Sequence, residues 1–458
     1  FSDNRGQGLA VISESFASPT LYRLYTDFKK NYPRAKWFTY EPLSDENIYS
    51  GSQLATGKNY QPVYDYAKAK VILSLDSDFL LTENENITAN RGFAAGRKLE
   101  TEKDSMNRLY VVENNFSITG GMADHRLRLP TSKIIDFCTA LMNELGIHMG
   151  KPDLSSIDKK WLQEVAADLK KNKGNSLVVA GKKQPTVVHA MVMAINNVLG
   201  NAGNSVTYIE LKDAVLPRTE SIRDLKTSVQ DKEINTLIIL DGNPVFNAPA
   251  DLEFTHILKK IEKTVHLSLY QDETSQLVNW HLPLAHFLES WGDARSLNGT
   301  VSVMQPLIEP LFGGRSMAEV LNLLINGEDL RGYEIVRSTW KSILKSGDFE
   351  FNWTKVLHDG LFANSQPIKE IPKISAAKIE LYLSKNHRPE KLSAENIEVV
   401  FQQSPAVYDG RFANNGWLQE MPDPVTKLSW DNTALISPNT AKELNLKNED
   451  LIKIDYKG

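Results

Sequence analysis

Short apolar runs alternate along the chain with longer segments in which apolar residues recur every three or four positions. The runs have the length of buried strands, and the longer segments have the spacing of amphipathic helices. The runs interpreted as strands are Leu9–Ile12, Val71–Leu75, Leu109–Val112, Leu177–Ala180, Val206–Ile209 and Thr236–Leu240. Strands and helices that alternate in this way indicate parallel sheets covered by helices.

Several of the expected helices have clear end signals. Ser18–Pro19 supplies an N-cap and a first-turn proline, and Ser316 with Glu319 has the spacing of a capping box. Gly146 and Gly200 can each close a helix as a C-terminal cap. Helical spacing predicts helices near 21–28, 134–145, 161–169, 188–199, 317–324, 335–344 and 353–357.

These elements predict an α/β protein with two parallel-sheet α/β units and covering helices, followed by the start of a mixed β barrel. We expect a first unit at 1–150, a second unit with a helical extension at 151–375, and the barrel at 376–458. In the last part, Ile379–Leu383 and Ile397–Phe401 have the composition of strands between frequent Pro and Gly turns. Leu451–Asp455 has the pattern of a strand just beginning, so further residues are expected after it.

Composition excludes some classes of protein. The 458 residues exceed what one hydrophobic core usually organises. The net charge of -5 gives no basic surplus for general nucleic-acid binding. No apolar run approaches the roughly 18 residues that a membrane-spanning helix needs.

Cys138 is the single cysteine of the sequence. One thiol cannot form an internal disulfide or supply the several thiolates that hold an iron–sulfur cluster. It lies in an apolar helical stripe, so we expect it to behave as a small buried hydrophobe.

Two predicted strands run into similar acidic turns. Val71–Leu75 is followed by Asp76-Ser-Asp78, and Thr236–Leu240 is followed by Asp241-Gly-Asn243. The carboxyl ends of parallel strands are where open α/β sheets bind ligands, so both turns are candidate pocket walls. The alternative is that Asp76 and Asp241 only stabilise a turn or cap a helix, as Asp often does.

The densest polar constellation contains His281, His286, Glu289, Asp293 and Arg295. Such residues can bind a metal or exchange protons, but the five-residue separation of the histidines does not match two ligands on one helix face. Local ion pairs and turn contacts are the alternative.

Other motifs favour ordinary structural roles. Asn4–Gly8 precedes a strand instead of following one, which is the wrong place for a dinucleotide fingerprint. Gly313–Arg315 precedes a helix where amides can meet an anion, but a plain loop is the favoured interpretation. His189 is expected in the core, and Lys170–Lys173 at a solvated helix end.

A set of segments resembles the molybdopterin oxidoreductases of the dimethyl-sulfoxide-reductase type. Ser18–Thr20, Tyr40–Pro42, Phe93–Arg97 and Ala123–Asp124 resemble the first α/β half, Asn196–Asn201 and Gly242–Pro244 the second, and Trp417–Asn432 the start of the C-terminal barrel. Four further segments resemble the molybdopterin-like, iron–sulfur-fused subunit of bacterial alternative complex III: Asp241–Asp251, Gln271–Thr274, His286–Arg295 and Gln305–Leu311. The same segments also resemble polysulfide-reductase-like enzymes.

The resemblance implies a respiratory complex that oxidises membrane quinol on the periplasmic side of the bacterial inner membrane. It implies that this part holds no molybdopterin and that iron–sulfur clusters lie in another part of the polypeptide. The implied partners are a multihaem cytochrome c, integral membrane quinol-oxidising subunits and, as a further candidate, a terminal oxidase. No molybdenum ligand or amino-terminal cysteine cluster of the catalytic members maps onto this sequence.

The sequence therefore predicts a non-catalytic scaffold that positions an iron–sulfur domain, with no catalytic, cofactor-binding or metal-binding residue assigned. The first alternative is an active molybdopterin-dependent oxidoreductase, similar to polysulfide reductase. The second is a soluble nucleotide-binding module.

Overall fold

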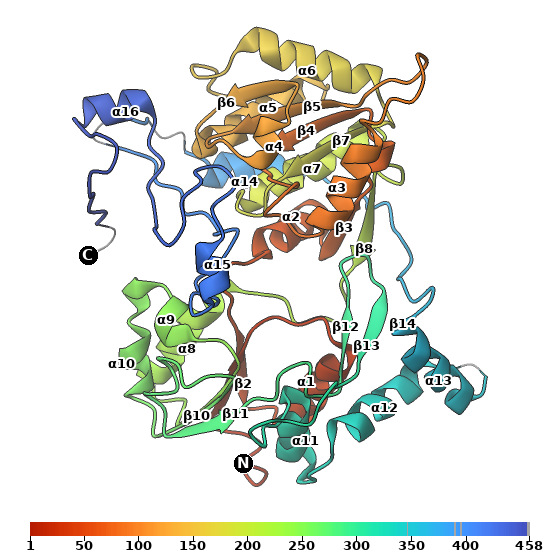
Figure 1. Ribbon diagram of the computed structural model, residues 1–458, viewed down its shortest axis with the longest axis vertical. Helices are drawn as coiled ribbons and strands as arrows, with labels where there is room; N and C mark the ends of the chain where they lie inside the picture. Colours follow the sequence, from red (N-terminus) through yellow and green to blue (C-terminus); the bar gives the residue numbers. More distant parts are fainter. Residues whose placement is uncertain (346, 389–390, 394–395, 456–458) are drawn as a thin grey trace. The chain divides into compact units, whose positions relative to one another are not determined.

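The computed structural model describes residues 1–345, 347–388, 391–393 and 396–455. These residues form two compact units, and both units are discontinuous in sequence. Unit 1 comprises Phe1–Glu46 and Leu211–Pro367, and unit 2 comprises Asn47–Glu210 with the described residues of 368–455. Both units combine helices with parallel strands, which confirms the predicted α/β class (Figure 1).

Unit 1 contains a five-stranded parallel sheet in the order β11-β10-β9-β1-β2 and a three-stranded antiparallel sheet, β12-β13-β14. Its strands are β1 (Leu9–Ser13), β2 (Lys36–Thr39), β9 (Thr236–Leu240), β10 (Lys263–Ser268), β11 (Trp280–Pro283), β12 (Gly292–Arg295), β13 (Val301–Met304) and β14 (Leu361–Phe362). Its helices are α1 (Pro19–Asn31), α8 (Thr219–Gln230), α9 (Pro244–Asn247), η3 (Ala250–Leu252), α10 (Phe254–Leu258), α11 (Met317–Asn326), α12 (Gly332–Ile343) and α13 (Phe349–Asp359).

The central strands of unit 1 bury both faces of their sheet. In β1, Ala10 and Ile12 pack into one cluster with residues of α8 and α10, while Leu9 and Val11 pack into another with α1, α11 and α12. Successive side chains of a strand point to opposite faces, so an unbroken apolar run suits a strand covered on both sides.

Unit 2 contains a four-stranded parallel sheet in the order β6-β5-β4-β7 and an antiparallel pair, β3 with β8. Its strands are β3 (Tyr60–Tyr64), β4 (Val71–Leu75), β5 (Arg108–Glu113), β6 (His125–Arg128), β7 (Ser176–Ala180) and β8 (Val206–Glu210). Its helices are α2 (Glu46–Thr56), η1 (Tyr66–Lys68), α3 (Asn86–Ala95), α4 (Ile118–Gly121), η2 (Thr131–Lys133), α5 (Ile134–Glu144), α6 (Lys159–Lys171), α7 (Thr186–Val198), α14 (Ala376–Asn386), α15 (Gly416–Glu420) and α16 (Pro438–Glu443).

The helix ends follow the sequence signals. Ser18 accepts a hydrogen bond from the amide of Leu21 at the start of α1, and both bonds of the Ser316–Glu319 capping box are formed at α11. Gly146, just after α5, has a positive φ of 83°, a conformation that costs glycine little. In the described part of the chain, no helix combines the length and apolar character needed to cross a bilayer.

The expectation that residues 1–150 form one sheet unit is wrong. β1 pairs with β2 on one side and with β9 of the later segment on the other, whereas β4 pairs with β5 and with β7 in a separate sheet. The chain leaves unit 1 after β2, builds most of unit 2, and returns near Leu211. Strands adjacent in sequence are neighbours in only about two-thirds of cases, and here each sheet also pairs strands from distant segments.

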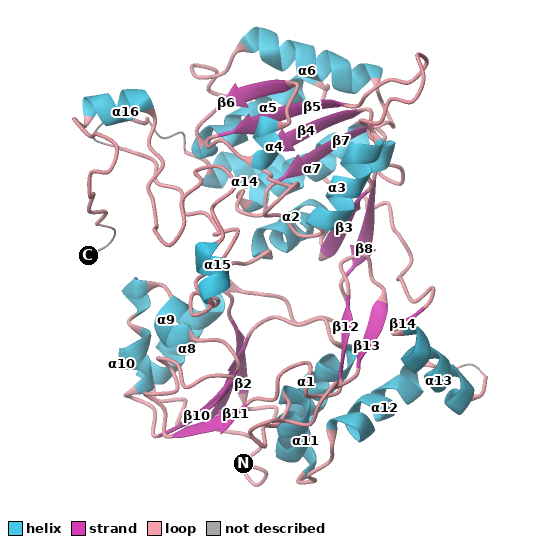
Figure 2. Ribbon diagram, viewed as in Figure 1, coloured by secondary structure: helices cyan, strands magenta, loops and turns pink. Residues whose placement is uncertain are grey.

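The expected barrel strands in 376–458 are also wrong for the described residues. Ile379–Leu383 lies within α14, and Ile397–Phe401 and Leu451–Asp455 have no regular structure. The Ser375 hydroxyl caps α14, and Ile379 and Leu383 are buried four positions apart on one helix face. Figure 2 shows that the described residues after α14 are mostly loop, with the short helices α15 and α16.

Candidate functional site

The two acidic turns predicted from sequence share a backbone conformation. Asp76 follows β4 and Asp241 follows β9, with φ of 52° and 62° respectively. Each aspartate donates its amide to the carbonyl of the next-to-last residue of a neighbouring strand, Val112 of β5 at 2.7 Å and Leu267 of β10 at 2.8 Å. The motif-level repeat in the sequence therefore corresponds to a repeated turn at the carboxyl edge of each parallel sheet.

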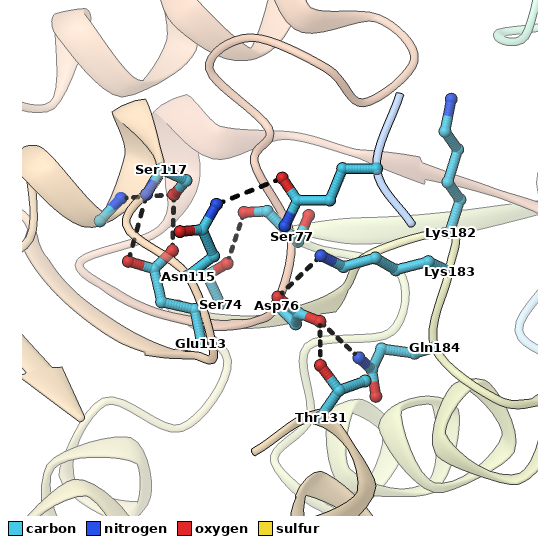
Figure 3. Close-up of polar contacts among 12 residues, drawn as sticks. Ser74, Asp76, Ser77, Glu113, Asn115, Ser117, Thr131, Lys182, Lys183 and Gln184 are labelled. Carbon is cyan, nitrogen blue, oxygen red and sulfur yellow. Dashed lines mark hydrogen bonds and ion pairs between the residues drawn. The ribbon is translucent and has the colours of Figure 1, made fainter. Parts of the chain in front are cut away.

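Asp76 is the most buried carboxyl group of the unit 2 turn, with 6% of the residue exposed. Figure 3 shows its carboxyl group among Lys183, Thr131 and Gln184. The lysine lies 3.1 Å away, the threonine hydroxyl donates at 3.2 Å and the glutamine amide donates at 2.8 Å. Burial raises the pKa of Asp76, and Lys183 and Thr131 partly offset this. These three partners support the interpretation of Asp76 as a turn-stabilising residue.

The other carboxyl groups at this edge are also engaged by the protein. Asp78 accepts hydrogen bonds from the amide and hydroxyl of Thr119, at 2.9 and 2.7 Å. Glu113, which ends β5, accepts from the Ser117 hydroxyl at 2.6 Å and from Arg126 at 2.5 Å. The arrangement can hold loops β4–α3 and β5–α4 in place, and it offers no converging set of free carboxylates.

The equivalent edge of unit 1 has a small pocket beside Asp241. Ser13, Glu14 and Tyr40 line it together with Asp241 and Asn243. The Asn243 side chain is fixed on both sides, since it accepts from the Thr274 hydroxyl at 2.7 Å and donates to Glu273 at 2.7 Å. The prediction of a polar pocket wall thus fits this turn.

The histidine–carboxylate constellation does not converge on one point. His281 lies on β11, 3.1 Å from the Ser268 hydroxyl, while the amide of His286 donates to Glu289. Arg295 pairs with Asp213. Among residues 1–345, 347–388, 391–393 and 396–455, no group of three or more His, Cys, Asp or Glu is placed to hold a metal ion. Local contacts therefore account for this segment.

Asp293, from the same constellation, is a buried structural carboxyl group. It accepts hydrogen bonds from the Ser18 hydroxyl, from the amide and hydroxyl of Thr20, and from the indole N–H of Trp340. It thereby joins β12 to the start of α1 and to α12.

The remaining candidates lie where the sequence analysis placed them. Cys138 is completely buried in the core of unit 2, and burial raises the pKa of its thiol. Gly6 and Gly8 form a turn before β1, and Arg315 pairs with Asp329 at 3.0 Å. Lys170 and Lys171 form the last turn of α6, as expected of a helix end.

Several residues of the unit 2 edge were missed, namely Glu113, Asn115, Ser117, Thr131, Lys182, Lys183, Gln184 and Glu398. Glu113 and Asn115 follow a predicted strand in the same way as Asp76, and so do Lys182 and Lys183. Treating the polar residues after every predicted parallel strand as candidates would have found these four residues. Glu398 has no such signal, because its partners are far away in sequence.

His189 gives a pH prediction. It is buried in α7, and burial lowers its pKa to about 4, against roughly 6.5 in an unfolded chain. Because the folded state holds His189 neutral, the contribution of His189 to stability is complete above about pH 6.5. This contribution is lost as the pH falls towards about 4. We expect His189 to account for about 3 kcal/mol of the acid loss of stability between these values. Denaturant unfolding of His189→Gln across this range should show a smaller pH dependence, whereas the exposed control His148→Gln should match the unmodified chain.

Comparison with known proteins gives weak matches to solved structures. No family model and no curated protein matches the sequence. Acetylene hydratase from Pelobacter acetylenicus matches 69% of this chain at 12% identity and a TM-score of 0.48, and the match spans 55% of that chain, about half of its length. The formyltransferase/hydrolase complex from Methylorubrum extorquens, solved with methylofuran, matches 75% of this chain and 95% of its own at 12% identity and a TM-score of 0.46. The first is a distant fold resemblance to a molybdopterin enzyme, and neither match assigns a family or a function.

Proposed function

We propose that this chain is a non-catalytic, molybdopterin-oxidoreductase-like scaffold in a respiratory quinol-oxidising complex of the alternative complex III type. Its role is to hold an iron–sulfur domain, located outside these residues, close to its electron-transfer partners. The proposed partners are a multihaem cytochrome c and integral membrane subunits, on the periplasmic side of the bacterial inner membrane. The sequence segments that resemble that subunit motivate the proposal.

The single observation that carries the proposal is the position of the only cysteine. Cys138 lies on α5 inside the core of unit 2, completely buried. A thiol with a raised pKa in apolar surroundings is a poor metal ligand, because the thiolate is the form that binds metals. No second cysteine exists in the sequence to complete a cluster site.

The carboxyl groups at the sheet edge of unit 2 do not fit a molybdenum ligand either. In the resembled family the metal ligand is Cys, selenocysteine, Ser or Asp. Asp76 has both carboxyl oxygens engaged by Lys183, Thr131 and Gln184. Freeing either oxygen for a metal would leave buried polar partners without a hydrogen bond, which is costly.

A body without redox chemistry can still serve electron transfer. Electrons pass efficiently only across short gaps between cofactors, so a folded support that fixes those gaps has a function of its own. Unit 2 has one large hydrophobic core cluster and unit 1 has separate clusters on the two faces of its parallel sheet, and close-packed cores of this kind supply rigidity within each unit.

Purification of the native protein in mild detergent tests this proposal. We expect the chain to co-purify with a multihaem cytochrome and membrane subunits, and elemental analysis to find no stoichiometric molybdenum or tungsten on it. Recovery as a lone monomer would refute the scaffold, and bound molybdenum would instead favour the catalytic alternative. Tight guanine-nucleotide binding by the isolated chain would favour the nucleotide-binding module.

A further inference from the structure

A segment near the end of the chain crosses the carboxyl edge of the unit 2 parallel sheet. We name Asn396–Arg411 the C-terminal strap. It has neither helix nor strand, and it belongs to unit 2 together with the sheet. Its side chains contact the loops that follow β6, β5 and β7. In open α/β sheets this is the edge at which ligands bind.

Glu398 makes the first of these contacts. Its carboxylate accepts the amide of Thr131 at 2.7 Å on one oxygen and the amide of Ser132 at 2.9 Å on the other. Both amides belong to η2, which leads directly into the eleven-residue helix α5. The Ser132 hydroxyl is buried beside them and has no hydrogen-bond partner among the described residues. Free amides at the start of a helix favour oxyanions. Here the carboxylate of Glu398 takes the place of an external oxyanion.

Gln402, Gln403 and Tyr408 continue the strap. Asn115, after β5, donates to the Gln402 side chain at 3.3 Å. Lys182, after β7, donates to Gln403 at 2.6 Å, and its ammonium lies 5.8 Å from the centre of the Tyr408 ring. The strap is therefore held at several separate points on the edge.

The order of the contacts matches the order of the strands. The sheet runs β6-β5-β4-β7, and the strap meets the β6 loop at Glu398, the β5 loop at Gln402 and the β7 loop at Gln403. Three strand spacings amount to about 14 Å. Five residues reach at most about 17 Å when extended. An extended strap is thus just long enough to close this edge with these contacts.

We propose that the C-terminal strap closes the carboxyl edge of unit 2, and that Glu398 occupies an oxyanion site formed by the amides of Thr131 and Ser132. The ligand class that this site accepts in place of Glu398 is a small oxyanion such as inorganic phosphate. The inference goes beyond the scaffold proposal and does not depend on it, because it concerns contacts within unit 2 alone. Failure to co-purify with respiratory subunits would leave the strap unaffected.

Hydrogen–deuterium exchange on the full chain tests the strap. We compare the unmodified chain with Glu398→Ala and with Glu420→Ala, a control that removes an exposed acid from the same C-terminal region. In Glu398→Ala, the amides of Thr131 and Ser132 should exchange at least tenfold faster, and the control should not change them. Unaltered exchange in Glu398→Ala would overturn the proposal.

Phosphate tests the oxyanion site in the same samples. Millimolar inorganic phosphate should restore protection of the two amides in Glu398→Ala, while chloride at equal ionic strength should not. The unmodified chain, in which Glu398 fills the site, should show no phosphate effect at these amides. Lys182→Gln provides a second variant, which should speed exchange within residues 400–411 at least threefold. Two results would contradict the inference. One is that phosphate fails to restore the amide protection lost in Glu398→Ala, and the other is that amide exchange within residues 400–411 is unchanged in Lys182→Gln.

Discussion

Replacing Asp293 with alanine is expected to lower the free energy of unfolding of unit 1 by about 4 kcal/mol. Asp293 is 2% exposed, and four donors from α1 and α12 point at its carboxyl oxygens. Alanine would leave the hydroxyls of Ser18 and Thr20 and the indole N–H of Trp340 buried without an acceptor. Leaving these buried donors without an acceptor costs more stability than the loss of the carboxyl group's own hydrogen bonds would cost alone.

Chemical denaturation followed by tryptophan fluorescence measures this effect, because Trp340 lies in direct contact with the substituted side chain. The control is Asp231→Ala, which removes an exposed aspartate just after α8 in the same unit and should change stability by less than about 0.5 kcal/mol. An Asp293→Ala chain as stable as this control would mean that the four hydrogen bonds carry no net stabilisation.

Asp293 also shows how a sequence cluster can mislead. His281, His286, Glu289 and Asp293 are close in sequence, which suggested metal or proton chemistry. A strand, a loop and a second strand then separate them, since His281 lies on β11 and Asp293 on β12. The partners of Asp293 are instead Ser18 and Thr20, more than 270 residues away. Short spacing in sequence does not determine convergence in space.

The local pattern predicted most elements of the two sheets. Val71–Leu75 and Thr236–Leu240 have the predicted bounds, and the capping signals at Ser18 and Ser316 mark true helix starts. These features depend on side-chain periodicity and on hydrogen bonds within a few residues, which a single sequence contains.

The pairing of the strands could not be predicted in the same way. β1 has neighbours from both ends of the unit 1 sequence, with Val11 opposite Trp37 on one side and Ile238 on the other. The two partners are short strands of four and five residues, and strand length alone does not say which segments share a sheet. The grouping is decided by packing across the sheet faces, which involves residues distant in sequence.

The last part of the chain was mispredicted for a different reason. Ile379–Leu383 is a short run whose apolar residues suit a strand or a helix face equally. The Ser375 cap and the burial of Ile379 against the unit 2 core favour the helix. The Glu398 contacts could not be predicted from the sequence either, because the amides that donate to Glu398 precede it by more than 260 residues.

Replacing Gly181 with alanine is expected to destabilise unit 2 by about 3 kcal/mol. Gly181 follows β7, and its amide donates to the carbonyl of Leu75 at 3.0 Å. A Cβ at this position would lie 2.0 Å from the carbonyl oxygen of Asp76 and 2.8 Å from its carbonyl carbon. Because these are backbone atoms of a buried turn, the overlap can be relieved only by moving β7 and β4 apart.

The matched control is Gly150→Ala, since a Cβ there meets no atom within 4 Å and the residue has no positive φ. Denaturation midpoints should show the large loss for Gly181→Ala and a change below about 0.5 kcal/mol for Gly150→Ala. The displaced turn also carries Asp76, so Gly181→Ala should weaken the contact with Lys183 and alter the acid dependence of unit 2 stability. Equal stability of the two variants would show that the Asp76 turn can move away from a Cβ at position 181 at little cost in free energy.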